Sequence, residues 1–191
     1  MKNKTYEYSF LNSNKFCKEK YCLISLREED IELIRIWRNE QIPVLRQKKI
    51  ITKNEQYEYF LKTIMPSFIT KKPECILFSF IIDQKCIGYG GFVNIDWTNQ
   101  KSEISFLLDT NRVKKLKIYQ KEFEIFLELI IQLNKKYLKF ATIFTETYDF
   151  RLEHIKILEK IGFKNIKKIM TDKKDHHGNF LNSIIHEKMI N

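Results

Sequence analysis

The feature that most constrains the fold is an alternation of strands and helices in the second half of the chain. Residues 103–108 form an apolar segment of strand length, and a helical segment follows from about residue 118 to 134. Residues 138–145 predict another strand, and residues 151–161 predict a short helix that ends at Gly162. The long helix has a wide apolar face, made of Tyr119, Phe123, Phe126, Leu127, Ile130 and Leu133. We therefore expect it to pack across a sheet built from these strands.

The first half of the chain predicts two helices and a meander. A strand over residues 21–26 leads into a helix that starts at the acidic residues 28–30 and runs to about Asn39. Asn54 is the expected cap of a second helix, which runs through residue 64 and ends before Pro66. The strands expected after it span residues 76–82, 87–97, 103–108, 163–170 and 180–188, the last two joined by a turn at His177-Gly178-Asn179.

Composition indicates one packed domain. The chain has 191 residues, of which 43% are hydrophobic and 14% aromatic. That length suits one full core rather than two. We expect residues 21–191 to form a single domain, and residues 1–20 to form an N-terminal arm or an extra edge strand. The chain starts without an apolar signal core and has no apolar run long enough to cross a bilayer, so we expect a cytoplasmic protein with no membrane partner.

Charge and cysteines leave more alternatives open. The net charge of +10 is compatible with nucleic acid, a membrane surface, a phosphate-rich ligand, or simply a lysine-rich solvated surface. The lysines are scattered and no nucleic-acid-binding motif appears, so we do not expect nucleic acid as the partner. The four cysteines, Cys17, Cys22, Cys75 and Cys86, lack metal-ligand spacing, and we expect reduced thiols and no metal site.

Three local motifs resemble a known family. LREEDIELIRIWRNEQ at residues 26–41 resembles the opening of those GNAT-superfamily N-acetyltransferases that acetylate ribosomal-protein N-termini and nucleotide-linked amino sugars. EISFLLD at residues 103–109 resembles the fourth strand of that superfamily, and ILEKIGF at residues 157–163 resembles the end of its fourth helix. The resemblance implies the GNAT acyl-CoA N-acyltransferase fold, of α/β (α+β) class. Its central, mostly antiparallel twisted sheet has about six or seven strands and is flanked by about four helices.

The resemblance also implies the substrates. An enzyme of this family transfers an acetyl group from acetyl-CoA to a primary amine without a metal. WRNEQIPVLRQ at residues 37–47 resembles acyltransferases found among surface-glycan genes. That favours the amino group of a nucleotide-activated amino-deoxysugar as the acceptor, attacked directly in a ternary complex. A protein N-terminus, another small amine, or a non-catalytic binding role are the alternatives, and a homodimer is one open oligomeric state.

For the donor, the resemblance implies that the strand at residues 103–108 splays from its neighbour and offers its edge to the pantetheine arm. Phe106, Leu107 and Leu108 would supply that edge. The diphosphate would lie at the start of the next helix, where the helix dipole favours anions. The glycine-rich loop typical of the family is absent here, so either cations replace it or the loop is merely solvated and binding is weak or lost. The candidates for cofactor binding are Asn111, Arg112, Lys114, Lys115, Lys117 and, before the last helix, Arg151.

Glu103 is the expected general base. Transfer to an amine requires a base, a donor for the oxyanion and a proton for the leaving thiolate. A two-residue turn at Asn99-Gln100 would place Asp96 opposite Glu103, and two facing carboxylates favour proton uptake by one of them. A solvated pair at the edge of the sheet is the alternative. We expect the oxyanion donor to be a backbone N–H near Leu107.

The general acid is less certain from the sequence. The family commonly has a tyrosine four residues before the glycine of its Gly-Phe pair, where this chain has Leu158. His154 lies one turn earlier on the same helix face, and Tyr148 and Asp149 stand upstream. One of these could substitute, although a lone helical histidine is more often a surface residue. The resemblance also allows a reaction without a dedicated acid, in which the thiol leaves as thiolate.

The acceptor candidates come from the first helix, the loop after it and the meander. Arg35, Arg38 and Asn39 share a helix surface, and Arg46 follows in the loop. Arginine forks fit phosphate oxygens and could hold a nucleotide diphosphate, or they could form an ordinary charged helix face. Tyr89, Asp96 and Trp97 complete the candidate substrate-binding set, the two aromatic residues either stacking on a sugar or base or packing in the core.

Overall fold

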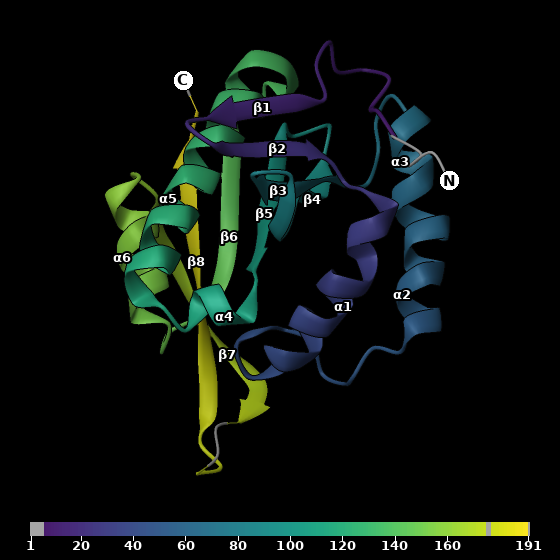
Figure 1. Cartoon of the computed structure of the whole chain (residues 1–191). Helices are drawn as coiled ribbons and strands as arrows, with labels where there is room; N and C mark the ends of the chain where they lie inside the picture. Colours follow the sequence, from purple (N-terminus) through teal and green to yellow (C-terminus); the bar gives the residue numbers. More distant parts are fainter. Residues whose placement is uncertain (1–5, 175–176, 191) are drawn as a thin grey trace.

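The computed structural model describes residues 6–174 and 177–190, which form one eight-stranded sheet with helices on both faces (Figure 1). The strand order is β1-β2-β3-β4-β5-β6-β8-β7, and all neighbours are antiparallel except β5 and β6, which are parallel. The strands are β1 (Lys15–Lys18), β2 (Tyr21–Ser25), β3 (Ile76–Ile82), β4 (Lys85–Asp96), β5 (Lys101–Leu108), β6 (Thr142–Tyr148), β7 (Lys164–Lys174) and β8 (Phe180–Met189). The expected class is confirmed, and the sheet has one edge strand, β1, beyond the expected number.

Two layers of helices cover opposite faces of the sheet (Figure 1). One layer contains α1 (Ile31–Glu40), α2 (Lys53–Tyr59) and α3 (Met65–Ile69), and the other contains α5 (Leu116–Leu133) and α6 (Leu152–Lys160). The short helix α4 (Thr110–Val113) connects β5 to α5, and short 3₁₀ turns cover Glu28–Asp30 and Ile42–Val44. The apolar face of α5 packs on the sheet as expected, with Phe126 against Phe80 and Phe106 at ring distances of 5.7 and 4.6 Å. This packing holds β5 against α5 beside the edge of β5 that faces β6.

Gly90 in β4 allows this close approach. A β-carbon built there would lie 2.2 Å from the carbonyl oxygen of Ser105 in β5 and 2.7 Å from the ring of Phe126. Neither backbone nor a buried ring can give way by that much, so the position requires glycine.

The second helical segment differs from the expected one. Thr52, not Asn54, caps α2: its side chain accepts the Glu55 N–H while Glu55 reaches back to the N–H of Thr52. The helix also continues beyond Pro66, because a π-helical turn at Phe60–Ile64 precedes it and Pro66 then lies in the first turn of α3. A proline is tolerated there because the first N–H groups of a helix have no helical acceptor.

The strand expected at residues 138–145 begins later. After α5 the chain makes a second π-helical turn, Asn134–Leu138, and Lys139 adopts the left-handed conformation with φ 62°. The Asn134 side chain ends this segment by bonding both the N–H and the C=O of Phe140 at 2.9 Å. β6 therefore starts at Thr142 and ends at Tyr148, three residues beyond the expected end of the strand.

The expectation that all cysteines are reduced is wrong for one pair. Cys17 and Cys22 face each other across the β1–β2 hairpin, with their α-carbons 4.1 Å apart, and form a disulfide. The expectation failed because residues 15–18 had no assigned strand partner in the sequence. Cys75 and Cys86 are free thiols, and burial raises the pKa of both, that of Cys86 to about 12. Within the described ranges no helix has the length and apolar character needed to cross a bilayer.

Candidate active site

The parallel strands β5 and β6 pair over only the first part of β5. The pairs are Lys101 with Thr142, Ser102 with Ile143, and Glu103 with Phe144. Beyond Glu103 the strands diverge and enclose a cavity of about 100 Å³, while β5 stays paired with β4 as far as Leu108. The expected splay is therefore present, and it begins at the residue expected to act as base.

Part of the expected cofactor edge lies along this cavity. Phe106 lines it and stacks on Phe123 of α5 with ring centroids 4.7 Å apart. Leu107 and Leu108 lie beyond its lining, and their side chains, 4% and 1% exposed, belong to the core. The carbonyl of Leu108 already accepts a hydrogen bond from Gln41 Nε2 at 2.8 Å.

Glu103 is a buried carboxylate at the start of the splay. It is 3% exposed, and its Oε2 accepts a hydrogen bond from Asn94 Nδ2 at 2.7 Å. Its Oε1 forms an ion pair with Arg46, whose Nη1 contacts Glu146 Oε2 of β6 at 2.9 Å. Glu103 thus has a neutral partner on one side and a cation shared with a second carboxylate on the other.

The partner expected for Glu103 is wrong. Val93 lies opposite Glu103 and Asp96 lies opposite Lys101, because β4 has an irregularity between Val93 and Asp96. Asn94 adopts a left-handed backbone there, with φ 48°, which turns its amide toward Glu103. The polar partner of Glu103 is therefore an amide rather than a carboxylate.

Asp96 and Trp97 shape the β4–β5 turn instead of binding substrate. Asp96 accepts the N–H groups of Thr98 and Asn99 at 3.0 and 2.9 Å, and these bonds lower the pKa of its carboxyl. Trp97 donates its indole N–H to the carbonyl of Pro73 and packs on the ring of Phe140. Both residues lie at the end of β5 opposite to the splay and line neither of the two cavities described for this protein.

His154 forms the helical wall of the cavity. It is 6% exposed, stacks on Phe123 at 4.1 Å, and its Nδ1 lies 2.6 Å from the hydroxyl of Tyr119. Arg151 donates to the same hydroxyl at 3.1 Å. Burial, followed by the charges of Arg151 and His186, holds the pKa of His154 well below its usual value. The imidazole is therefore neutral at neutral pH, and it is a buried residue rather than a surface one.

Tyr148 presents a protonated hydroxyl group to the same region. It is 5% exposed, and burial, followed by the Glu146 carboxylate, raises the pKa of its phenol. The ammonium group of Lys173 lies over its ring at 4.9 Å. Of the two candidates for proton donor, Tyr148 keeps its phenol proton at neutral pH. His154 is held as the neutral imidazole, which is a much weaker acid than imidazolium.

The basic segment after β5 divides into two parts. Arg112 forms a bidentate ion pair with Glu122, which is 1% exposed, with Arg112 Nε 2.8 Å from Glu122 Oε2. That guanidinium is therefore committed to α5 rather than free for a phosphate, because a buried carboxylate requires a cation. The N–H of Asn111 is likewise taken by the Asp109 side chain, which caps α4.

The remaining cations surround the start of α5. The side chain of Lys115 stands at the N-cap without capping the helix, so the first N–H groups of α5 point outward along the helix dipole. Lys114, Lys115 and Lys117 are exposed there. These donors and charges fit the diphosphate of acetyl-CoA, although the chain has α4 where the family has a glycine-rich loop.

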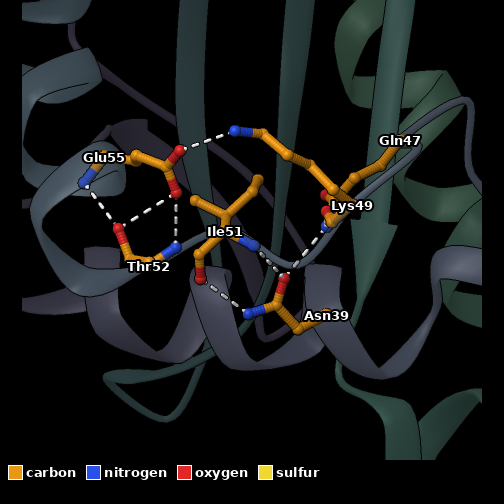
Figure 2. A network of polar contacts seen from close by, with 6 residues as sticks. All are labelled: Asn39, Gln47, Lys49, Ile51, Thr52 and Glu55. Atoms are coloured by element: carbon orange, nitrogen blue, oxygen red, sulfur yellow. Dashed lines mark hydrogen bonds and ion pairs between the residues drawn. The ribbon is translucent and has the colours of Figure 1, made fainter.

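The polar face of α1 mainly supports the loop that follows it. Asn39 donates to the carbonyl of Ile51 at 2.8 Å and accepts the N–H of Ile51 and the amide of Gln47, both at 2.9 Å (Figure 2). Arg35 is paired with Glu32 and also donates to the Ile51 carbonyl. Neither residue is placed for substrate binding as expected, because the loop backbone uses their donors.

Arg38 and Tyr89 also bind each other. The Arg38 guanidinium donates to the Tyr89 hydroxyl and to Gln47 Oε1, both at 3.0 Å. The contact with Tyr89 is the main factor that raises the pKa of Arg38. Tyr89 is 7% exposed, so its ring packs in the core rather than offering a stacking surface.

A second cavity, of about 420 Å³, lies between the α1–α2 loop and β7. Lys173 of β7 donates to the carbonyls of Ile42 and Leu45, both at 2.6 Å, and its burial lowers the pKa of its ammonium group. The residues shared by this cavity and the one between β5 and β6 are Arg46, Glu146 and Tyr148. The two cavities therefore adjoin at these side chains, and we call the second one the acceptor groove.

Comparison with known proteins identifies the class. A family model described as an acetyltransferase (GNAT) domain matches residues 23–183, and the chain belongs to this family. A sequence comparison with curated proteins gives no match. The activity of the chain is acyl-CoA-dependent N-acetyl transfer, with acetyl-CoA as the donor. Within the described part of the chain, no cluster of His, Cys, Asp and Glu could hold a metal ion.

Solved structures share the fold at low sequence identity. A spermidine N-acetyltransferase from Vibrio cholerae, solved with CoA and spermine, has a TM-score of 0.75 and 13% identity over 91% of this chain and 97% of its own. A ribosomal-protein-S5-alanine acetyltransferase from Vibrio fischeri has a TM-score of 0.71 and 15% identity over 94% and 98%. An N-acetyltransferase from Staphylococcus aureus Mu50 has a TM-score of 0.69 and 16% identity over 91% and 100%.

Sequence reasoning missed several residues of this site. Tyr119 was assigned only to the apolar face of its helix, and Glu146 and Lys173 were not singled out at all. Alternation along β6 could have found Glu146, since Phe144, Glu146 and Tyr148 fall on one face of that strand. The contact of Asn94 with Glu103 depends on the irregularity in β4, which regular strand pairing does not predict.

Proposed function

We propose that the chain acetylates the primary amine of a small molecule, foremost a nucleotide-linked amino-deoxysugar of surface-glycan biosynthesis, in the cytoplasm. Glu103 carries this proposal. It is a buried carboxylate at the point where β5 and β6 separate, and it lines the cavity between these strands, which we call the donor cavity. Its ion-pair partner Arg46 lines both the donor cavity and the acceptor groove. A base at that junction can reach an amine that enters from the groove.

The first task of the site is to deprotonate the acceptor. A primary amine is an ammonium ion at neutral pH and has no lone pair for attack. Glu103 accepts one proton from it, and Asn94, bonded to the other carboxylate oxygen at 2.7 Å, fixes the orientation of the carboxylate. Burial at 3% exposure keeps water from competing for the same proton.

The second task is to return a proton to the sulfur. Acetyl-CoA supplies the acetyl group as a thioester, whose C–S bond breaks as the C–N bond forms. Tyr148, whose pKa is raised by burial, donates its proton to the departing sulfur and regains one from the amine nitrogen. The ammonium thus loses two protons in all, one to Tyr148 and one through Glu103 to solvent.

The donor would be held by the edge of β5 and the start of α5. Ile104, Ser105 and Phe106 of β5 line the cavity where β6 diverges, and the first N–H groups of α5 lie in the segment that carries Lys114, Lys115 and Lys117. Arg151 lines the cavity from α6 and adds a further cation. These groups match the amide-rich pantetheine arm and the diphosphate of acetyl-CoA.

The acceptor groove supports the choice of a phosphate-bearing acceptor. Lys48 lines it, is 77% exposed and, among the described residues, is ion-paired with Asp172 at the surface. This cation could meet the phosphates of a nucleotide sugar. The carboxylates of Glu146 and Asp172 on the same groove favour a second candidate, a polyamine or a protein N-terminus, of the kind named for two structures that share the fold.

The test of the proposed function is acetyl-CoA-dependent release of thiol with amine acceptors, compared for the wild type and Glu103→Gln. We expect turnover to fall roughly a hundredfold or more in Glu103→Gln, because the amide cannot take the proton. Glu124→Gln, on the outer face of α5 and paired with Lys160, is the matched control and should keep its rate. Near-normal turnover of a folded Glu103→Gln protein would reject Glu103 as the base.

A thermal-shift comparison separates the acceptor classes. Protection by uridine or thymidine diphosphate, but not by spermidine, would support the nucleotide-linked acceptor. Protection by spermidine alone would favour the polyamine. Melting that stays unchanged with acetyl-CoA itself, in a cleanly folded sample, would contradict the enzymatic role altogether.

A further inference from the structure

Arg46 occupies the junction between the donor cavity and the acceptor groove. Its guanidinium is paired with Glu103 of β5 and, at 2.9 Å, with Glu146 of β6. The two carboxylates come from neighbouring strands, and their side chains are 4% and 22% exposed. Two partly buried carboxylates directed at one point require a cation between them, and in this structure the chain itself supplies it.

The three members of this cluster differ in how firmly they are held. Glu103 and Glu146 stand on paired strands of the sheet, and Asn94 fixes one oxygen of Glu103. Arg46 comes from the α1–α2 loop, and its side chain is 50% exposed. The carboxylates therefore form the rigid part of the cluster, and the arginine side chain is the part that can leave.

The loop need not move for this exchange. Asn39 binds Gln47 and both backbone groups of Ile51, and Lys173 binds the carbonyl of Leu45 on the other side (Figure 2). The backbone around Arg46 is thus anchored on both sides. A rotation about the side-chain bonds of Arg46 suffices to vacate the junction.

The present arrangement places a guanidinium on the base. Each oxygen of Glu103 accepts one bond, from Arg46 and from Asn94. A guanidinium does not give up its proton in a protein, so Arg46 can neither act as an acceptor nor pass Glu103 a proton. An ammonium group that takes the place of Arg46 contacts the same carboxylate oxygen and can give it a proton.

We propose that Glu103, Glu146 and Asn94 form a binding site for the primary ammonium group of the acceptor, and that Arg46 fills this site as an internal competitor until the acceptor displaces it. The inference rests on the proposed function and specifies its acceptor: a cationic primary amine whose ammonium replaces a guanidinium. It also assigns Arg46 a role opposite to that of a substrate anchor. Removing an anchor weakens binding, whereas removing a competitor strengthens it.

The test measures binding of two small cations, methylguanidinium and n-butylammonium, by calorimetry without acetyl-CoA. The variants are Arg46→Ala and Lys49→Ala, the latter a control in the same loop whose side chain is ion-paired with Glu55 and lines neither cavity. We expect Arg46→Ala to bind both cations about tenfold or more tightly than the wild type, because an internal occupant lowers the apparent affinity in proportion to the fraction of molecules whose site is open. Lys49→Ala should match the wild type.

Two further variants keep the test decisive. Arg46→Gln retains most of the side chain and should show the same gain if Arg46→Ala is too unstable to measure. Adding Glu146→Gln to Arg46→Ala removes one of the two carboxylates and should abolish the gain. Equal or weaker cation binding by folded Arg46→Ala and Arg46→Gln would overturn the inference.

The proposed function has a separate readout. Binding of acetyl-CoA and release of thiol are measured in the same protein samples. Tight cation binding by Arg46→Ala, together with no acetyl-CoA affinity in any variant, would refute the proposed function while supporting the ammonium site. Normal acetyl-CoA-dependent turnover with no gain in cation binding would refute only the ammonium site.

Discussion

Acidification should destabilise this protein through His154. The imidazole is 6% exposed, stacks on Phe123, and accepts or donates one hydrogen bond with Tyr119 at 2.6 Å. Its pKa lies well below the ordinary value of 6.5, first because of burial and then because of the charges of Arg151 and His186. The folded protein therefore keeps His154 neutral at a pH where the unfolded chain binds a proton there.

The sign and size of the effect follow from linkage. A depressed pKa in the folded state contributes stability that is complete above the unfolded pKa and is lost as the pH falls below it. With 6.5 for the unfolded chain, lowering the pH from about 7.5 to about 5 costs at most about 2 kcal/mol of unfolding free energy for this one group. His186, whose pKa is also lowered mainly by burial, adds a loss in the same direction.

The assay is urea unfolding followed by circular dichroism at several pH values, for the wild type and His154→Gln. Glutamine keeps a hydrogen-bonding group near Tyr119 and cannot be protonated. The variant should be less stable at about pH 7.5, because packing on Phe123 is lost, and this deficit should shrink by up to about 2 kcal/mol at about pH 5. His177→Gln, an exposed histidine in the β7–β8 connection, is the matched control. A deficit that stays constant with pH would show that His154 is not held neutral by the fold.

The remaining predictions separate the two parts of the basic segment after β5. Replacing Lys114, Lys115 and Lys117 together by glutamine should weaken CoA binding about tenfold, at about 0.5 kcal/mol for each charge near the start of α5, without changing the melting temperature in the absence of CoA. Unchanged affinity for CoA would show that this segment is merely solvated. Arg112→Ala should instead leave Glu122 buried without its cation. The expected loss is about 2 to 3 kcal/mol of unfolding free energy in urea, less than for a fully buried ion pair because Arg112 is partly exposed. A variant of Arg112 that lost CoA affinity at unchanged stability would reverse this division.

The sequence predicted the elements whose signals are local. The apolar spacing of Tyr119, Phe123 and Phe126 describes one helix face, and Gly162 ends a helix by adopting φ 90°, which other residues avoid. Such patterns depend on residues within a few positions of each other. They were sufficient for the fold class and for the family resemblance, which in turn implied the splay between the strands that the structure shows.

Only the tertiary structure decided which polar groups meet. Arg46 and Glu103 are 57 positions apart, and Arg112 reaches Glu122 across the turn between α4 and α5. The sequence marked both arginines as candidate ligand-binding cations because they lie in basic segments, but a cation binds the nearest buried carboxylate that the fold provides. The register of β4 shows the same limit, since one irregular residue exchanged Asp96 for Asn94 beside the base. The sequence by itself therefore determined which groups are present and on which elements, while long-range packing determined which charges are already paired and which remain for substrates.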